Sequence, residues 1–307
     1  MKRIDIHAHA VAFPELTPSH RYTGERFLSA DELIAMYDRF GIDRGVLLPI
    51  VSPEAQCFLM TSEGACFLSR QYSDHFSWFC NIDPRQGNND TTTDFAAMLA
   101  YYRSCGARGL GEVTANLPMD DPRVEALLAA CQDAGMPVTI HIGDLGGDYG
   151  LVDSLGLPKL EELLRKFPKL ILLGHSQKFW SEISGEVTEA IRGGAPKGPV
   201  APGGRVPELL RRYPNLCGDL SAGSGCNAIM RDPDFGYAFL EEFQDRLFYG
   251  TDICSPLDIG HIRVKMGPFL DDGVASGKLS AQARDKICWG NALRLLEGRW
   301  EIEERNL

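Results

Sequence analysis

Two histidines near the start of the chain have the spacing of a metal-binding pair. Residues 3–6 alternate as a short strand does, with Ile4 and Ile6 on one face, and His7 and His9 follow where that strand ends. Residues two apart on a strand point to the same side, so both imidazoles can approach one point. Neutral imidazole is the commonest metal-binding side chain. An isolated pair also fits two polar residues at a chain end, so its interpretation depends on residues further along.

Other residues with metal-ligand or acid-base chemistry end later apolar runs of strand length. These residues are Glu112, His141, His175, Asp219 and Asp252. Each has an alternative when taken singly. His141 could be a hydrogen-bonded core histidine, Asp252 a helix cap, and Asp219 a partner in a structural hydrogen bond. A buried Glu112 must be paired or metal-bound, and Arg108 on the same strand face is one candidate partner. One metal site explains all these positions together better than separate structural roles do.

The chain alternates strand-like and helix-like segments almost without interruption. Helical spacing of apolar residues separates short apolar runs at 3–6, 46–51, 76–82, 109–113, 137–142, 170–173, 215–221 and 246–249. Such alternation predicts a parallel sheet with helices outside it. Eight units and the absence of G-x-G-x-x-G after a strand favour a (β/α)8 TIM barrel over an open sheet. The candidate residues then share the carboxyl-end rim, where barrel active sites lie.

The domain prediction is one barrel spanning residues 1–307. This length is within the usual range of a single α/β barrel. A Gly/Pro-rich segment at about 185–205 is too long and too rich in breakers to be a simple connection. Because the alternating units continue on both sides of it, we expect a loop over the barrel mouth, a lid, and not a linker between domains.

The net charge of −11 argues against nucleic acid and anionic membranes as partners, since both require a clustered positive surface. We therefore expect a small-molecule substrate. The sequence shows neither a secretory leader nor an apolar run near 18 residues. Nine cysteines without a C-x-x-C motif indicate free thiols, and the expected location is the cytoplasm.

The candidate residues resemble those of the amidohydrolase superfamily. His7-x-His9, His141 and His175 on successive later strands and Gly-Thr-Asp252 on the last strand carry the resemblance. The undecorated chain is most similar to the amidohydrolase-related group that includes aminocarboxymuconate-semialdehyde decarboxylase. The resemblance implies a distorted (β/α)8 barrel, one or two divalent metals, most often zinc, and a possible homodimer. Manganese, cobalt and iron also suit nitrogen and oxygen ligands.

The same resemblance implies a role for each residue. His7, His9, His141 and Asp252 would be metal ligands. His175 would polarise the substrate, steady the attacking water or bind a second metal. Glu112 departs from the decarboxylase pattern and is similar to the bridging glutamate of TatD-like nucleases and other hydrolases of the superfamily. We therefore count Glu112 among the expected metal ligands, and one and two ions both stay open.

The predicted activity is metal-dependent hydrolysis of an amide, lactone, ester or similar bond. A bound divalent metal lowers the pKa of water from about 15.7 to about 7. Asp252 would take the proton of that water and return it to the leaving group, and His175 would donate to the developing oxyanion. The alternative is non-oxidative decarboxylation of an unsaturated or aromatic acid on the same scaffold. A TatD-like nuclease and a non-catalytic metal-binding barrel are further alternatives.

Several other residues complete the predicted site. Trp180 and Asp219 are the expected substrate-binding residues, and His20, Arg21 and Tyr22 could also contact substrate. The glycine-rich stretch 143–147 lacks the lysine of a phosphate loop and fits a loop near the site. The stretch 221–225 has the wrong order for a nucleophile elbow, and we expect a flexible loop there.

Overall fold

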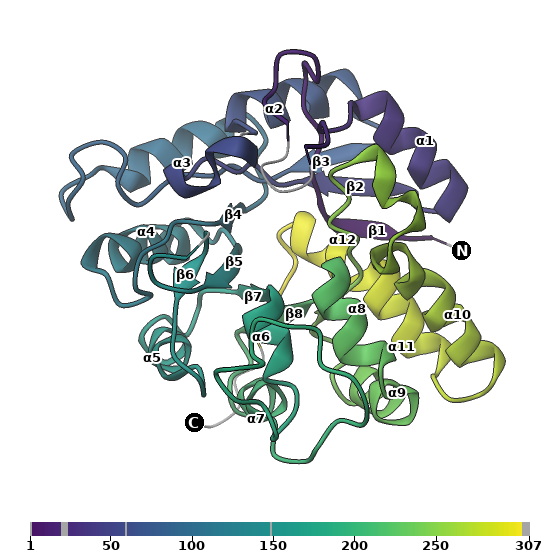
Figure 1. The fold of residues 1–307 in the computed structure, drawn as a ribbon. Coiled ribbons are helices and arrows are strands. Elements are labelled where there is room, and N and C mark those ends of the chain that lie inside the picture. Colours follow the sequence, from purple (N-terminus) through teal and green to yellow (C-terminus); the bar gives the residue numbers. More distant parts are fainter. Residues whose placement is uncertain (1, 20–23, 59, 148, 303–307) are drawn as a thin grey trace.

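The computed structural model describes residues 2–19, 24–58, 60–147 and 149–302. Eight parallel strands form the central ring: β1 (Ile4–Ala8), β2 (Arg44–Leu47), β3 (Phe76–Trp78), β4 (Leu110–Val113), β5 (Val138–Gly143), β7 (Leu172–His175), β8 (Leu216–Asp219) and β9 (Leu247–Phe248). They pair in the orders β1-β2-β3 and β4-β5-β7-β8-β9. Bridges from Cys80 to Leu110 and from Ala8 to Ile253 join the two groups. The result is a closed (β/α)8 barrel, as predicted (Figure 1).

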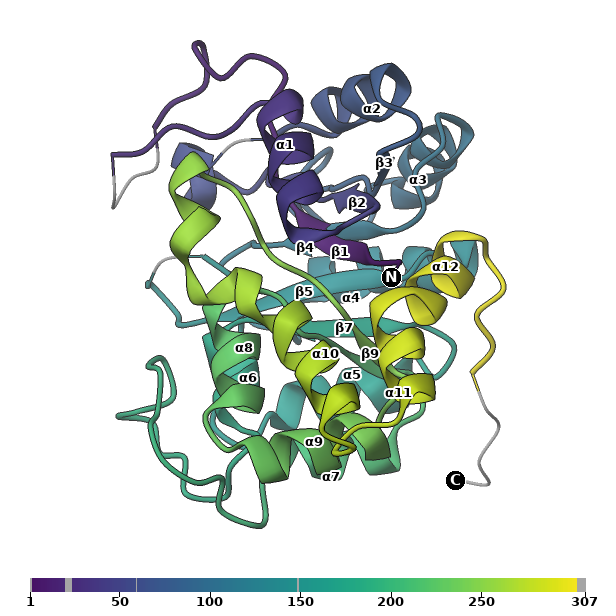
Figure 2. The ribbon, with the colours of Figure 1, turned by 90° about the vertical axis from the view of Figure 1, so that its right-hand side faces the viewer.

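Helices surround this ring on the outside (Figures 1 and 2). They are α1 (Ala30–Phe40), α2 (Ser62–Gln71), α3 (Phe95–Ser104), α4 (Pro122–Ala134), α5 (Pro158–Lys166), α6 (Gln177–Ser181), α7 (Arg205–Arg212), α8 (Ala222–Met230), α9 (Pro233–Glu242), α10 (Met266–Ala275), α11 (Ala281–Asp285) and α12 (Asn291–Leu296). The other elements are the 3-10 helices η1 (Pro53–Phe58), η2 (Pro256–Gly260) and η3 (Ile262–Lys265), the π-helix η4 (Lys286–Gly290) and the two-residue strand β6 (Leu151–Val152). Among the described residues, no helix combines the length and apolar character required to cross a membrane.

Local signals in the sequence fix where the helices begin and end. Ser29 accepts from the backbone of Glu32 at the start of α1, the glutamate side chain accepts from Ser29 in return, and Gly41 ends the helix with φ of 65°. Asp121 caps α4 ahead of Pro122, and Gly135 ends it in the same left-handed conformation. These caps fix where α1 and α4 begin and end, and so where the chain turns toward β2 and β5.

The barrel interior is filled by its own small apolar cluster. It contains Ile4 and Ile6 of β1, Phe79, Leu173 of β7 and Phe248 of β9, and α12 packs against it. A larger cluster fills the layer between the strands and the outer helices. Because the lower part of the ring is solid, polar chemistry is confined to the carboxyl ends of the strands.

Two irregularities in strand pairing lie where candidate ligands sit. Between β1 and β2, Asp5 pairs with Gly45 and Ala8 pairs with Leu47. The chain therefore advances three residues along β1 but only two along β2, and β1 contains one extra residue. Between β4 and β5, Leu110 pairs with Val138 and Val113 with Ile140, which is the same mismatch. An extra residue of this kind bends the strand and re-aims a side chain. His7 and Glu112 lie within these two segments.

The Gly/Pro-rich segment at 185–205 does not lie over the barrel mouth, contrary to the sequence-based prediction. It lies outside the ring of strands, beside α6, α7 and α8 (Figure 1). The buried guanidinium of Arg192 ties it down, with Nε 2.7 Å from Glu182 Oε1 and Nη1 donating to the Asp153 carbonyl at 2.7 Å. Asn227 of α8 donates to the Pro196 carbonyl at 3.0 Å. These interactions hold the segment against outer helices, which a lid would have to leave.

Candidate metal centre

The two histidines at the end of β1 present one nitrogen each to a shared point. His7 Nδ1 lies 2.6 Å from Asp219 Oδ2, and His9 Nδ1 lies 2.8 Å from the Leu48 carbonyl. Both partners accept hydrogen bonds, so each Nδ1 carries a proton and Nε2 is the nitrogen that each imidazole can offer to a metal. The two Nε2 atoms are 3.1 Å apart. Nitrogens this close require a proton or a cation between them, so the pair fits a metal position once His7 gives up its proton.

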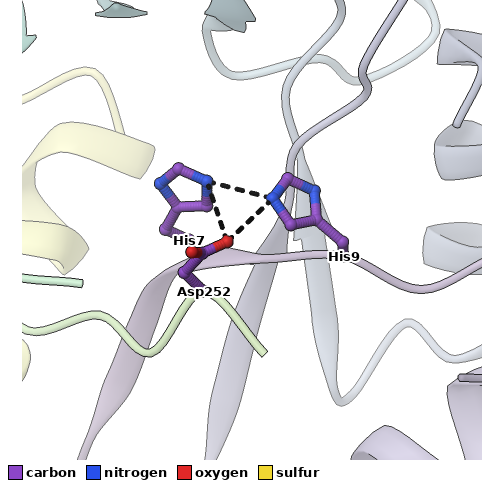
Figure 3. A group of neighbouring side chains, drawn as sticks. All are labelled: His7, His9 and Asp252. Atoms are coloured by element: carbon purple, nitrogen blue, oxygen red, sulfur yellow. Dashed lines mark hydrogen bonds and ion pairs between the residues drawn. The ribbon is translucent and has the colours of Figure 1, made fainter. Parts of the chain in front are cut away.

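Asp252 completes the first group of ligands. Its Oδ1 is 3.2 Å from His9 Nε2 and 3.9 Å from His7 Nε2, and the three side chains converge in Figure 3. The three donor atoms lie within 4.8 Å of one another. Arg263 of η3 lies 3.4 Å from Asp252 Oδ2 through Nη1 and also donates to the Asp252 carbonyl. The arginine therefore holds the carboxylate in place and leaves Oδ1 facing the histidines. The sequence offered no signal for this role of Arg263.

The two carboxylate oxygens of Glu112 face different imidazoles. Oε2 lies 3.4 Å from His7 Nε2 and 3.8 Å from His9 Nε2. Oε1 lies 2.6 Å from His141 Nδ1 and 3.6 Å from His175 Nε2. The residue is only 3% exposed, and Arg108, the partner that strand parity offered, is exposed at the surface. Glu112 thus stands between the histidines of β1 and those of β5 and β7, and His7, Glu112 and His175 form a second candidate ligand group.

The charges of these groups favour a cation. Burial opposes protonation of His7, but the carboxylates of Asp219 and Glu112 raise its pKa well above the usual value. Burial would raise the pKa of Glu112, yet His7 and His141 hold it well below normal. Burial and the neighbouring His7 lower the pKa of His175 to about 4. Ionised carboxylates and at least one neutral imidazole therefore meet in a buried space, which is the donor set that divalent metals require.

A layer behind the ligands orients them. Asp219, at the end of β8, is fully buried, and its Oδ2 lies 2.6 Å from His7 Nδ1 and 3.4 Å from His175 Nδ1. Its Oδ1 accepts from the Ser221 backbone at 3.0 Å, and Ser221 Oγ lies 3.0 Å from His175 Nδ1. The prediction that Asp219 contacts substrate is therefore wrong for this geometry, since the ligands cover it.

Two further predictions about this layer need correction. Trp180 is 1% exposed and its indole donates to the Asp219 carbonyl at 2.8 Å, so it supports β8 and does not line a substrate pocket. The stretch 221–225 is not a flexible loop, because Ser221 precedes α8 and the helix begins at Ala222. The alternation of Asp219 and Ser221 was the available signal for Ser221, since residues two apart share a side.

His141 is held from the side by the loop that follows β5. The Tyr149 ring lies 4.7 Å from the imidazole, between centroids. Gly150, with φ of 112°, packs so closely that a Cβ there would lie 2.8 Å from His141 Cδ2. The stretch 143–147 thus belongs to a loop beside the site, as predicted, and Asn116 donates to its Asp144 carbonyl at 2.7 Å. The predicted substrate contacts His20, Arg21 and Tyr22 lie outside the described residues.

A family model described as amidohydrolase matches residues 4–298. The chain belongs to the amidohydrolase family. Comparison with curated protein sequences gave no match. The family assignment agrees with the resemblance carried by the strand-end histidines and Asp252. Divalent metal binding is usual in this family, and the ligand groups described above are consistent with it.

Solved amidohydrolase structures share this fold across nearly their whole length. An amidohydrolase from Burkholderia multivorans with bound zinc is 14% identical, covers 97% of this chain and 99% of its own, and has a TM-score of 0.64. A probable 2-pyrone-4,6-dicarboxylic acid hydrolase from Acinetobacter baumannii with citric acid bound is 15% identical, with coverage of 97% and 100% and a TM-score of 0.59. A 2,6-dihydroxybenzoate decarboxylase from Rhizobium is 14% identical, with coverage of 97% and 99% and a TM-score of 0.54. At these identities the likeness concerns the fold alone.

Proposed function

We propose that this amidohydrolase is a two-metal hydrolase that cleaves an amide, lactone, ester or similar bond of a small molecule. The proposal rests on the position of the Glu112 carboxylate between two pairs of histidines. Its Oε2 faces His7 and His9, and its Oε1 faces His141 and His175. A carboxylate in this position can bind one ion through each oxygen. Two-metal hydrolytic sites use such a bridge to hold the ions close together.

The donor atoms fall into two sets around this bridge. His7, His9 and Asp252 would hold one ion together with Glu112 Oε2, and His141 and His175 would hold the other together with Glu112 Oε1. Glu112, Asp219 and Asp252 carry three negative charges in a buried space. Arg263 offsets one of these charges, so one divalent ion would balance the other two, and the choice between one and two ions rests on the position of Glu112. Zinc suits this mixture of imidazole and carboxylate, and manganese, cobalt and iron are alternatives.

Each protein group has a defined task in hydrolysis. A divalent metal held by these residues would lower the pKa of its water from about 15.7 to about 7 and so would supply a nucleophile at neutral pH. Asp252, ionised and fixed by Arg263, accepts the proton of the attacking water and returns it to the leaving group. Asp219 and Ser221 fix the Nδ1 side of His175, so that Nε2 faces Glu112. Binding, orientation and proton transfer are thus divided among separate residues.

Decarboxylation is the second candidate, and one observation favours it. His7, His9 and Asp252 form a three-ligand group without Glu112, which is sufficient for a single catalytic metal with an open position. Glu112 would then orient His141 by the 2.6 Å contact and would not bind metal. We prefer hydrolysis because decarboxylation with a single ion leaves Glu112 Oε2, which faces His7 Nε2 and His9 Nε2, without a role.

We further propose that the substrate is a small molecule and that the enzyme acts in the cytoplasm, with a homodimer as the proposed assembly. The net charge of −11 disfavours a polyanionic substrate, and this disfavours the nuclease alternative. A closed structural zinc site is commonly cysteine-rich. The groups found here are histidine and carboxylate, which disfavours the non-catalytic alternative.

The proposal is tested by a reaction panel on zinc-loaded protein. We expect hydrolysis of 4-nitrophenyl esters or of lactones and no release of carbon dioxide from dihydroxybenzoates. Glu112→Gln should lower kcat/KM by about 100-fold or more, whereas Glu182→Gln, at a buried glutamate outside the centre, should change it by less than about threefold. Carbon dioxide release without hydrolysis would show that the decarboxylase alternative is correct.

A further inference from the structure

A small polar cavity lies outside the ring of strands, between α6, α8 and the 185–205 segment, which are neighbours in Figures 1 and 2. Its volume is about 10 Å³, which holds one particle of about the size of a water molecule. All three elements line it, and the lining includes Gln177, Trp180, Gly194, Pro196, Ser224 and Arg231. Among the described residues that line it, none is a candidate metal ligand.

Two polar side chains from α8 reach this cavity from the same side. Ser224 is near the start of the helix and Arg231 is its C-cap, with helical backbone angles. They are about two helical turns apart and therefore share one face. Long side chains on a helix lean toward its N-terminus, so the guanidinium of Arg231 extends back toward Ser224. Ser224 Oγ and Arg231 Nε and Nη2 are buried and have no hydrogen-bond partner in the part of the chain that the structure describes.

The carboxylates nearest in charge to Arg231 do not occupy its buried edge. Both oxygens of Asp232 accept from backbone groups, Oδ2 from Val200 at 2.9 Å and Oδ1 from Phe235 at 3.4 Å. Glu186 is exposed to solvent. Burial lowers the pKa of the Arg231 guanidinium, against the opposing effect of Asp232 and Glu186. A buried positive charge costs free energy unless a negative charge and hydrogen bonds compensate it, so this edge favours an anion.

We propose that this cavity is a binding site for one monatomic anion, chloride in the cell, held by Ser224 Oγ and by Arg231 Nε and Nη2. Phosphate and carboxylate ions exceed the volume, and chloride is the abundant anion nearest in size to water. A water molecule brings two protons that need acceptors, whereas an anion accepts from all three donors and also balances the guanidinium charge.

The anion completes a junction that the protein groups have already begun. Asn227 of α8 donates to the Pro196 carbonyl at 3.0 Å, and Ser181 Oγ of α6 donates to the Arg192 carbonyl at 2.7 Å, so both helices are bonded to the 185–205 segment. An ion bound between the same three elements stabilises the folded chain, because the unfolded chain does not form the site. This role does not depend on the reaction at the metal centre.

Thermal unfolding in sodium chloride and in sodium gluconate at equal ionic strength tests the site, since gluconate is too large to enter. We expect the midpoint of wild type to be about 1–2 °C higher in chloride at about 200 mM. Arg231→Gln should remove this difference. Ser224→Ala keeps the charge and should raise the chloride concentration that gives half of the shift by about fivefold or more. Arg70→Gln is the matched control, because it removes an exposed arginine from the last turn of α2, and it should keep the wild-type difference.

Crystals of wild type grown in sodium bromide give the position of the ion, because bromide is identified by its anomalous scattering. We expect a bromide peak within hydrogen-bond distance of Arg231 Nε and Nη2. A water molecule at this position, or bromide only at exposed surface positions, overturns the proposal. Equal wild-type midpoints in the two salts also overturn it, and a bromide peak would then be an adventitious ion only. If Arg231→Gln does not fold, the bromide peak and the shifted chloride dependence of Ser224→Ala decide.

Discussion

Asp219→Asn isolates the orienting layer of the candidate centre from the ligands themselves. Asp219 Oδ2 is 2.6 Å from His7 Nδ1 and 3.4 Å from His175 Nδ1, so one oxygen holds imidazoles on both sides of Glu112. Asparagine keeps the size of the side chain but removes its charge. Where its Nδ2 faces His7, two donors meet, so the imidazole must turn or change tautomer. Either change withdraws the His7 Nε2 lone pair from the metal.

The expected magnitude follows from the contacts that are lost. A hydrogen bond to a charged partner contributes about 1.5–3 kcal/mol, and removing the group that orients a metal-binding histidine weakens metal binding by about 10- to 100-fold. That factor equals about 1.4–2.7 kcal/mol. Because the same carboxylate also faces His175, we expect both ions to bind more weakly, with the larger loss at the position that contains His7.

The assay is zinc content at a series of buffered free zinc concentrations, with bound metal measured per chain. Asp153→Asn is the matched control, since Asp153 is also a buried carboxylate, 4% exposed, but accepts from the backbone of Leu160 at 2.8 Å, away from the ligands. It should lower the free energy of unfolding and leave zinc affinity unchanged. Zinc affinity of Asp219→Asn within about twofold of wild type would refute the orienting role.

Three further predictions follow from individual residues. Glu112→Gln should lower bound metal from two ions to one per chain at saturating zinc, because His7, His9 and Asp252 remain, and elemental mass spectrometry measures this directly. Gly150→Ala should lower the free energy of unfolding by about 2–4 kcal/mol in urea titrations, since φ is 112° and the new Cβ meets His141. Gly146→Ala, with φ of 68° and open space, should cost about 1 kcal/mol, and equal losses in the two variants would contradict the packing argument. Burial raises the pKa of Glu182 from 4.5 to about 7, so the folded chain binds more protons than the unfolded chain between these values. The free energy of unfolding should therefore fall by up to about 3 kcal/mol as pH rises from 4.5 to 7, and Glu182→Gln should flatten that slope in denaturant titrations at several pH values. An unchanged slope in the variant would contradict this reasoning.

The barrel and the rim position of the six expected ligands could be predicted from sequence. Short apolar runs alternating with helical segments specify a parallel ring, and parallel strands bring their carboxyl ends to one face. His7, His9, Glu112, His141, His175 and Asp252 therefore had to lie on one rim, and the structure brings them together there. Their roles as metal ligands stay a prediction.

What could not be predicted depends on depth and irregularity within the strands. Period-two alternation does not reveal the extra residues in β1 and β4, so strand parity paired Glu112 with Arg108, although the histidines surround it. Asp219 and Trp180 are buried below the barrel mouth. The spacing of apolar residues in the sequence does not show how far below the rim a side chain lies. The position of the 185–205 segment depends on Arg192, the charged residue that ties it to Glu182 and to the Asp153 carbonyl. The sequence does not show that these residues are its partners.

The measurement that tests the central claim most directly is the metal content of purified, desalted protein, as ions per chain by elemental mass spectrometry. A bridging Glu112 predicts close to two divalent ions per chain, falling to one in Glu112→Gln. One ion in wild type that persists unchanged in Glu112→Gln would contradict the bridge and favour the single-metal decarboxylase. No bound metal, and none taken up on reconstitution, would contradict the whole account of the centre.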